Sequence, residues 1–258
     1  MSTLRVAMWS GPRNISTAMM RAFENRADCA VVDEPFYAAY LHMTGIDHPG
    51  REQILASQPQ DWREVAAQLC ESGPAAVYYQ KHMTQHLLPD MDMSFTTSMR
   101  NCFLIREPRR IIASYARIRP QFSLAELGFT QQRELFERER DRLGRVPPVL
   151  DAALTLENPQ AVLEQLCTVL GIPFDESMLS WPPGARDSDG VWAPHWYNAV
   201  WESTGFAAPA VDTTALQKNS GQSSAAVAPG PALTEEQERL CEHAELIYEE
   251  MRSHALSA

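Results

Sequence analysis

The sequence contains little cysteine, no long apolar run and no excess of positive charge. Its five cysteines are scattered and form no C-x-x-C pair, so we expect reduced thiols and neither a disulfide framework nor a bound metal. No apolar run approaches the ~20 residues of a membrane helix, and no signal segment precedes the first strand. The net charge of −11 disfavours nucleic acid and anionic membranes as partners. We therefore expect a cytoplasmic protein that binds neither.

The chain opens with a strand, a tight turn and a helix start. Leu4–Trp9 is an apolar run typical of a buried strand, Ser10–Ile15 has turn residues, and good helix formers follow Ser16. Unpaired N–H groups at a helix start attract anions. Arg13 and the hydroxyls of Ser16 and Thr17 would add donors for phosphate oxygens. The stretch therefore predicts a phosphate-binding loop.

This loop lacks the lysine of the nucleotide-hydrolysing loop G-x-x-x-x-G-K-[ST], because Ile15 stands in its place. A donor without a triphosphate does not need that charge. Residues 12–17 (PRNIST) resemble the 5′-phosphosulfate loop of sulfotransferases that use 3′-phosphoadenosine-5′-phosphosulfate (PAPS). The resemblance implies PAPS as co-substrate, no metal, and a donor site formed by Gly11, Arg13, Asn14, Ile15, Ser16 and Thr17.

Strands alternate with helices along the rest of the chain. Strand patterns at 29–32, 76–80, 101–106 and 149–151 are separated by helical patterns, which indicates βαβ units. We expect an α/β fold of the P-loop type, with three layers (α/β/α) around a central parallel sheet of about five strands.

The 258 residues are predicted to form one sulfotransferase-like domain, 1–258. Residues 217–232, rich in Ser, Gly, Ala and Pro, are predicted to be a mobile loop. A capped, acidic start at Thr234 predicts a final helix over 234–253.

A second resemblance lies in residues 103–118 (FLIREPRRIIASYARI). PAPS sulfotransferases carry an arginine at a strand end and a serine two helical turns later, which together hold the 3′-phosphate of the donor. Here these residues are Arg106 and Ser114. A forked, permanently charged donor and a short hydroxyl suit a fixed phosphate.

A base and a cation are needed to move a sulfuryl group to a hydroxyl. Lys81-His82 follows a predicted strand and resembles the lysine and histidine of cytosolic sulfotransferases, so His82 is a candidate base and Lys81 a charge stabiliser. Adjacent strand residues point to opposite faces, so both can serve only if the strand has ended. His86 is a reserve candidate. Glu34, before Pro35, resembles the carboxylate base of some carbohydrate-acting members, and a raised pKa would suit it.

A loop-rich segment carries four large aromatic residues, Trp192, Trp196, Tyr197 and Trp201. They could belong to the core or form the wall of an acceptor site.

The leading hypothesis is a PAPS-dependent sulfotransferase acting on a hydroxyl, or an amine, of a small-molecule acceptor, as a monomer or homodimer. One alternative is a P-loop small-molecule kinase, for which Asp33 is the only candidate magnesium ligand. Another is a non-catalytic nucleotide-binding protein that kept the loop and lost the chemistry.

Overall fold

A computed structural model of the chain describes residues 3–71, 73–206 and 233–256. Within these residues the strands form one parallel sheet in the order β2-β3-β1-β4-β5. The strands are β1 (Leu4–Ser10), β2 (Cys29–Asp33), β3 (Val77–Met83), β4 (Arg100–Ile105) and β5 (Val149–Asp151). The predicted α/β fold with a central parallel sheet of five strands is therefore confirmed.

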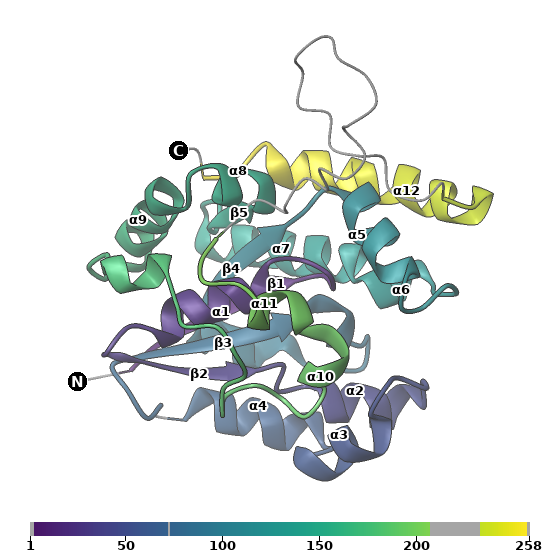
Figure 1. The fold of residues 1–258 in the computed structure, drawn as a ribbon, viewed down its shortest axis with the longest axis horizontal. Helices are drawn as coiled ribbons and strands as arrows, with labels where there is room; N and C mark the ends of the chain where they lie inside the picture. The colour runs from purple at the N-terminus through teal and green to yellow at the C-terminus, as the bar shows by residue number, and fades with distance from the viewer. Residues whose placement is uncertain (1–2, 72, 207–232, 257–258) are drawn as a thin grey trace, which may run out of the picture.

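Helices connect successive strands and cover both faces of the sheet (Figure 1). They are α1 (Ser16–Glu24), α2 (Tyr37–Thr44), α3 (Arg51–Ser57), α4 (Trp62–Cys70), α5 (Pro108–Ala116), α6 (Leu124–Leu127), α7 (Phe129–Leu143), α8 (Ala152–Glu157), α9 (Pro159–Leu170), α10 (Ala193–Trp196), α11 (Asn198–Trp201) and α12 (Glu235–Arg252), with 3-10 turns η1 (Thr84–His86), η2 (Met93–Ser98) and η3 (Glu176–Leu179). The predicted final helix corresponds to α12. The loop predicted at 217–232 lies outside the described residues.

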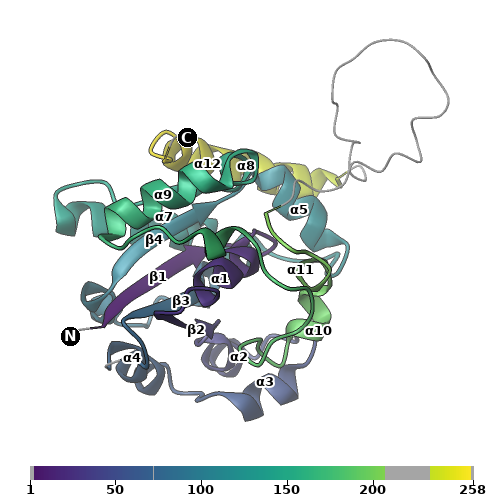
Figure 2. The same ribbon diagram turned by 60° about the vertical axis from the view of Figure 1, so that its left-hand side comes forward.

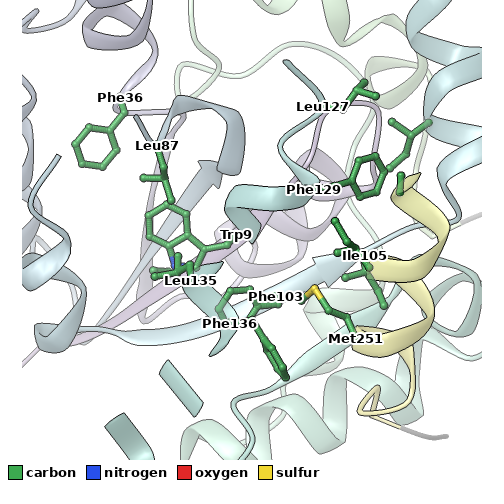
Figure 3. Packing of buried hydrophobic residues seen from close by; sticks show 14 of the residues in the cluster. Trp9, Phe36, Leu87, Phe103, Ile105, Leu127, Phe129, Leu135, Phe136 and Met251 are labelled. Carbon is green, nitrogen blue, oxygen red and sulfur yellow. The ribbon is translucent and has the colours of Figure 1, made fainter. Parts of the chain in front are cut away.

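Alternating side chains of β1 supply two separate apolar cores. Val6 and Met8 face α1 and α9 on one side of the sheet. Ala7 and Trp9 face α4, α5, α7 and α12 on the other side, in the core that Figure 3 shows. Each large side chain that is fully buried contributes roughly 1.5–3 kcal/mol to stability. The central strand is thus held from both sides, which fixes the position of the loop that follows it.

The carboxyl ends of β1, β2, β3 and β4 meet at one edge of the sheet, where ligands of open α/β folds bind. A third apolar cluster, from α2, α3 and α10, packs beside this edge. Figures 1 and 2 show α10 and α11 alongside the ends of β1 and β3. A segment distant in sequence therefore reaches the same edge as the first loop.

Candidate active site

The predicted phosphate loop connects β1 to α1, and α1 begins at Ser16 as expected. Arg13 has a φ of +55°, in the left-handed region. The Asn14 side chain stabilises the turn, because its Oδ1 accepts a hydrogen bond from Ile15 N at 2.8 Å and its Nδ2 donates to the Leu104 carbonyl at 3.0 Å. Asn14 therefore attaches the loop to the end of β4, which keeps the start of α1 in place.

Gly11 has a packing role in this loop. A Cβ atom at Gly11 would lie 2.8 Å from the carbonyl oxygen of Leu127, inside contact distance with backbone. Only glycine allows the loop and α6 to approach this closely. Gly11 lines neither of the two cavities described below.

The two predicted phosphate-binding elements meet at Arg13. Its Nε donates to Ser114 Oγ at 3.0 Å, and Arg106 Nη1 donates to the Arg13 carbonyl at 2.5 Å. Burial, followed by the neighbouring Arg110 and Arg13, lowers the pKa of Arg106, and burial followed by Arg117 lowers that of Arg13. Partly buried cations that crowd each other in this way would be stabilised by a bound anion.

Two cavities border the loop. The wide cavity, about 470 Å³, is lined by the loop, Arg106 and α11, with Ile15, Thr17 and Ala18 from the start of α1. The narrow cavity, about 80 Å³, is lined by Ser16 and Thr17 from the same helix start and by Glu34, Tyr37, His48, Gln85, His86 and Tyr115 from across the sheet edge. Both cavities include Arg13, Asn14, Thr17, Trp196 and Tyr197.

A buried ionic cluster lies beside the narrow cavity. Lys81 Nζ donates to Asp33 Oδ1 at 2.8 Å, to Glu34 Oε1 at 2.6 Å and to the Tyr197 hydroxyl at 2.5 Å, and its side chain is 1% exposed. Burial works against the ammonium, but the two carboxylates outweigh it and raise the pKa of Lys81. Trp192 Nε1 donates to the same hydroxyl at 3.1 Å. All three ammonium protons are therefore used inside the protein.

Glu34 is the member of this cluster that lines the narrow cavity. Its φ of +40° and that of Arg13 are the only positive values at non-glycine residues in the described part of the chain. Backbone strain of this kind concentrates at functional sites. The hydrogen bonds of its carboxylate to the described residues all involve Oε1, so Oε2 has no partner among them. Burial raises the pKa of Glu34, against the attraction of Lys81.

His82 lies away from both cavities. Strand β3 continues to Met83 instead of ending near residue 80, so Lys81 and His82 point to opposite faces of the sheet. The His82 ring stacks on Trp9 at a centroid distance of 4.1 Å and its Nε2 pairs with Gln80 Oε1 at 3.2 Å. Burial lowers its pKa to about 3. This placement does not fit the expected role of His82 as a base. His86 does line the narrow cavity.

The four aromatic residues of the loop-rich segment divide between the core and the cavities. Trp196 and Tyr197 line the cavities, whereas Trp192 is 2% exposed in the core and Trp201 Nε1 donates to Asp189. Asp189 also pairs with Arg21 of α1 at 2.5 Å. Asp33 Oδ2 accepts a hydrogen bond from Gly190 N at 3.1 Å. The segment is therefore attached to α1 and to β2.

The sequence did not single out several residues of the narrow cavity: Tyr37, His48, Gln85 and Tyr115. Tyr115 lies within the motif at 103–118 but was not singled out there, the other three lie outside the predicted motifs, and no spacing pattern relates the four. The described residues contain no group of three or more His, Cys, Asp or Glu side chains arranged for a metal ion. None of the described helices is both long and apolar enough to cross a membrane.

The sequence of this chain is similar to those of two plant proteins. Two Arabidopsis thaliana proteins, named branched-chain-amino-acid aminotransferase-like protein 1 and 2, are 37% identical over 202 residues and 36% identical over 203. Each alignment covers 78% of this chain and 36% of the relative, so the chain spans about a third of their length. Their name describes the longer proteins, and their activity is not transferred to this chain.

Solved structures share the fold. The sulfotransferase domain from the curacin biosynthetic pathway superposes with a TM-score of 0.53 at 14% identity, covering 95% of this chain and 98% of that one. The sulfotransferase domain of the Synechococcus PCC 7002 olefin synthase gives 0.52 at 16% identity, with 94% of each chain covered. The family model described as "Sulfotransferase domain" matches residues 4–228. The predicted resemblance is thus confirmed, and the chain belongs to the sulfotransferase domain family.

Proposed function

We propose that this protein transfers a sulfuryl group from PAPS to a hydroxyl of a small-molecule acceptor. Family and fold support the sulfotransferase class. The observation that carries the choice of donor is the meeting of Arg106 and Ser114 with the phosphate loop at Arg13. A donor with a 5′-phosphosulfate and a separate 3′-phosphate carries two anionic groups, and these residues provide donors for both.

The wide cavity fits such a donor. Its volume of about 470 Å³ lies within the range usual for cofactor sites. The start of α1 and Arg13 would hold the 5′-phosphosulfate, and Arg106 with Ser114 the 3′-phosphate. Bound PAPS supplies the sulfuryl group and leaves as adenosine 3′,5′-bisphosphate. The crowded guanidinium groups would stabilise the charge that develops on the leaving phosphate oxygen.

Glu34 is the base in this proposal, in place of His82. Glu34 lines the narrow cavity, its Oε2 is free of hydrogen bonds from the described residues, and its raised pKa favours proton uptake. The acceptor oxygen forms a bond to sulfur while the bond from sulfur to the bridging phosphate oxygen breaks, and the hydroxyl proton passes to Glu34. Lys81 would position Glu34 and balance one carboxylate of the cluster, since its protons are already used.

The kinase alternative has less support. Asp33, the candidate magnesium ligand, uses Oδ1 for Lys81 and Oδ2 for Gly190 N, and both oxygens accept from Tyr197. A metal would have to compete with these buried bonds.

Calorimetry with adenosine 3′,5′-bisphosphate, compared with ATP and Mg²⁺, tests the donor. Arg106→Ala should weaken bisphosphate binding by roughly 10- to 150-fold, because it removes a charge-assisted hydrogen bond. Arg109→Ala is the matched control. Arg109 follows Arg106 closely in the sequence, in the first turn of α5, but its side chain is exposed and pairs with Glu238. Preference for Mg-ATP, or equal effects of the two substitutions, would refute the proposal.

A further inference from the structure

One wall of the narrow cavity carries an unusual concentration of unpaired polar atoms. His48 Nε2, Gln85 Oε1, His86 Nδ1 and Trp196 Nε1 are buried and have no hydrogen-bond partner among the described residues, and all four residues line this cavity. His48, Gln85 and His86 are at most 6% exposed. Buried polar groups in folded proteins are nearly always hydrogen-bonded, so this many on one wall point to a ligand.

Aromatic packing holds this wall in place. The His86 ring lies stacked against Tyr37 and Tyr40, with centroid distances of 4.7 Å and 4.8 Å. His48 Nδ1 and the Tyr37 hydroxyl are 2.8 Å apart, and Trp196 lies parallel to Tyr115. Groups fixed by their neighbours need little reordering when a ligand binds. The unpaired atoms therefore form a preorganised set.

The set mixes donors and acceptors. Trp196 Nε1 can only donate, and Gln85 Oε1 can only accept. His48 Nε2 donates when the Tyr37 hydroxyl donates to Nδ1, and accepts in the other tautomer. A hydroxyl both donates and accepts, so it can satisfy either kind of atom. A carboxylate ligand could not donate to the oxygens of Gln85 and Glu34, and an ammonium could not accept from the Trp196 N–H.

The size and charge of the narrow cavity restrict the class of ligand further. A volume of about 80 Å³ has room for roughly five water-sized groups, so a fused aromatic ring system would extend out of the cavity. Burial lowers the pKa of His48 to about 4 and that of His86 well below its ordinary value, so both imidazoles are neutral near pH 7. Neither provides a cation for an acidic acceptor, and Arg13, which also lines this cavity, would be neutralised by the 5′-phosphosulfate of the donor.

We propose that the narrow cavity selects a compact, uncharged polyol, or the polyol end of a larger acceptor. One hydroxyl would lie at Glu34, and at least two others would pair with Gln85, His48 and Trp196. This inference rests on the proposed function, because it assigns the acceptor class of the same site.

The test compares three acceptors in the presence of PAPS: glycerol, propan-1-ol and 2-naphthol, with release of adenosine 3′,5′-bisphosphate as the readout. Glycerol should show a kcat/KM higher than that of propan-1-ol by about 10²-fold or more, because propan-1-ol leaves the wall unpaired. Equal or higher values for propan-1-ol or 2-naphthol would overturn the inference.

Substitutions test whether the preference for glycerol depends on the unpaired atoms of the cavity wall. Gln85→Leu should lower kcat/KM for glycerol by about 10-fold or more and leave propan-1-ol nearly unchanged. Gln131→Leu is the matched control, because Gln131 Oε1 is also buried and unpartnered but lines a different groove, between α7 and residues 87–93. Trp196→Phe removes the N–H and leaves a smaller aromatic ring, and should also reduce the preference for glycerol over propan-1-ol.

The outcomes separate the two proposals. If adenosine 3′,5′-bisphosphate binds and the alcohols are not distinguished, or if Gln85→Leu reduces both equally, the polyol inference fails while the sulfotransferase proposal stands. If the bisphosphate does not bind and none of the acceptors is sulfated, the proposed function itself fails.

Discussion

The two cavities share part of the phosphate loop but have opposite chemistry. The wide cavity is bordered by Arg13 and Arg106, whose pKa values are lowered chiefly by burial and further by neighbouring cations. The narrow cavity shares Arg13 but is otherwise bordered by Glu34 and by neutral imidazoles. One side therefore favours a bound anion, and the other favours a neutral ligand that can release a proton. The boundary between them is where a sulfuryl group would be transferred.

The number of charges on each side explains this difference. In the buried cluster one cation, Lys81, faces two carboxylates, Asp33 and Glu34. Asp33 is further bonded to Gly190 N and Tyr197, so it is the better satisfied carboxylate. Burial, and after it the neighbouring Asp33 carboxylate, raises the pKa of Glu34, although Lys81 lowers it. On the loop side the cations outnumber their partners instead.

Replacing Glu34 by Gln should have the largest effect, because it removes the base and keeps the shape of the side chain. We expect kcat to fall by about 10²–10⁴-fold, with binding of adenosine 3′,5′-bisphosphate unchanged in calorimetry. Arg106→Ala should show the converse, with a loss of binding. If Glu34→Gln retained full turnover, Glu34 would not be the base, and proton uptake would not be a function of the narrow cavity.

Lys81→Met should lower the free energy of unfolding by about 3–5 kcal/mol, because it leaves two buried carboxylates without their cation. The measurement is denaturant unfolding at neutral pH. Arg109→Met, which breaks the exposed pair with Glu238, is the control and should change little. A small effect of Lys81→Met would mean that the cluster is hydrated and that the two carboxylates do not depend on Lys81.

Tyr197→Phe should destabilise the protein by about 1–3 kcal/mol, since the hydroxyl pairs with Lys81, Asp33 and Trp192. Tyr79→Phe provides a matched control, because the Tyr79 hydroxyl is buried without a hydrogen-bond partner in the described residues. Its removal should be neutral or stabilising. The measurement is the temperature of thermal unfolding. Equal changes in the two variants would show that the hydrogen bonds of the Tyr197 hydroxyl to the cluster add no stability.

The pH dependence of kcat/KM should have an acidic limb above pH 4.5, the ordinary pKa of a glutamic acid. The active form of a base is deprotonated, so a raised pKa moves the loss of activity to higher pH. The rate should therefore rise with pH through the raised pKa of Glu34 and then level off. A flat profile down to pH 4.5 would contradict the raised pKa.

His82→Phe should have the smallest effect on rate, because His82 contacts Trp9 in the core and borders neither cavity. Its pKa of about 3 also keeps it neutral across the working range. The acidic limb should persist, and kcat should lose far less than the ~10²-fold expected on removal of a base. A large loss in a folded variant would restore His82 as the base.

Lys81 and His82 show where sequence reasoning reaches its limit. The pattern indicated a strand ending near residue 80, but β3 continues to Met83 because it pairs with β1 up to Ser10. The length of a central strand depends on its neighbours, and a difference of three residues decides which side chains reach the site. The loop, Arg106 and Ser114 were predictable because a strand end and a helix start fix their position locally.

The sequence by itself determined the alternation of strands and helices, the loop between β1 and α1, and the residues Arg106 and Ser114 that contact this loop. Each of these depends on local periodicity and turn chemistry over a few residues. Only the tertiary structure decided which carboxylate is unsatisfied and which imidazoles are buried, because pKa and hydrogen bonding depend on groups brought together from distant segments. Glu34 and Tyr197 are separated by 163 residues and lie 3.2 Å apart between Oε1 and the hydroxyl.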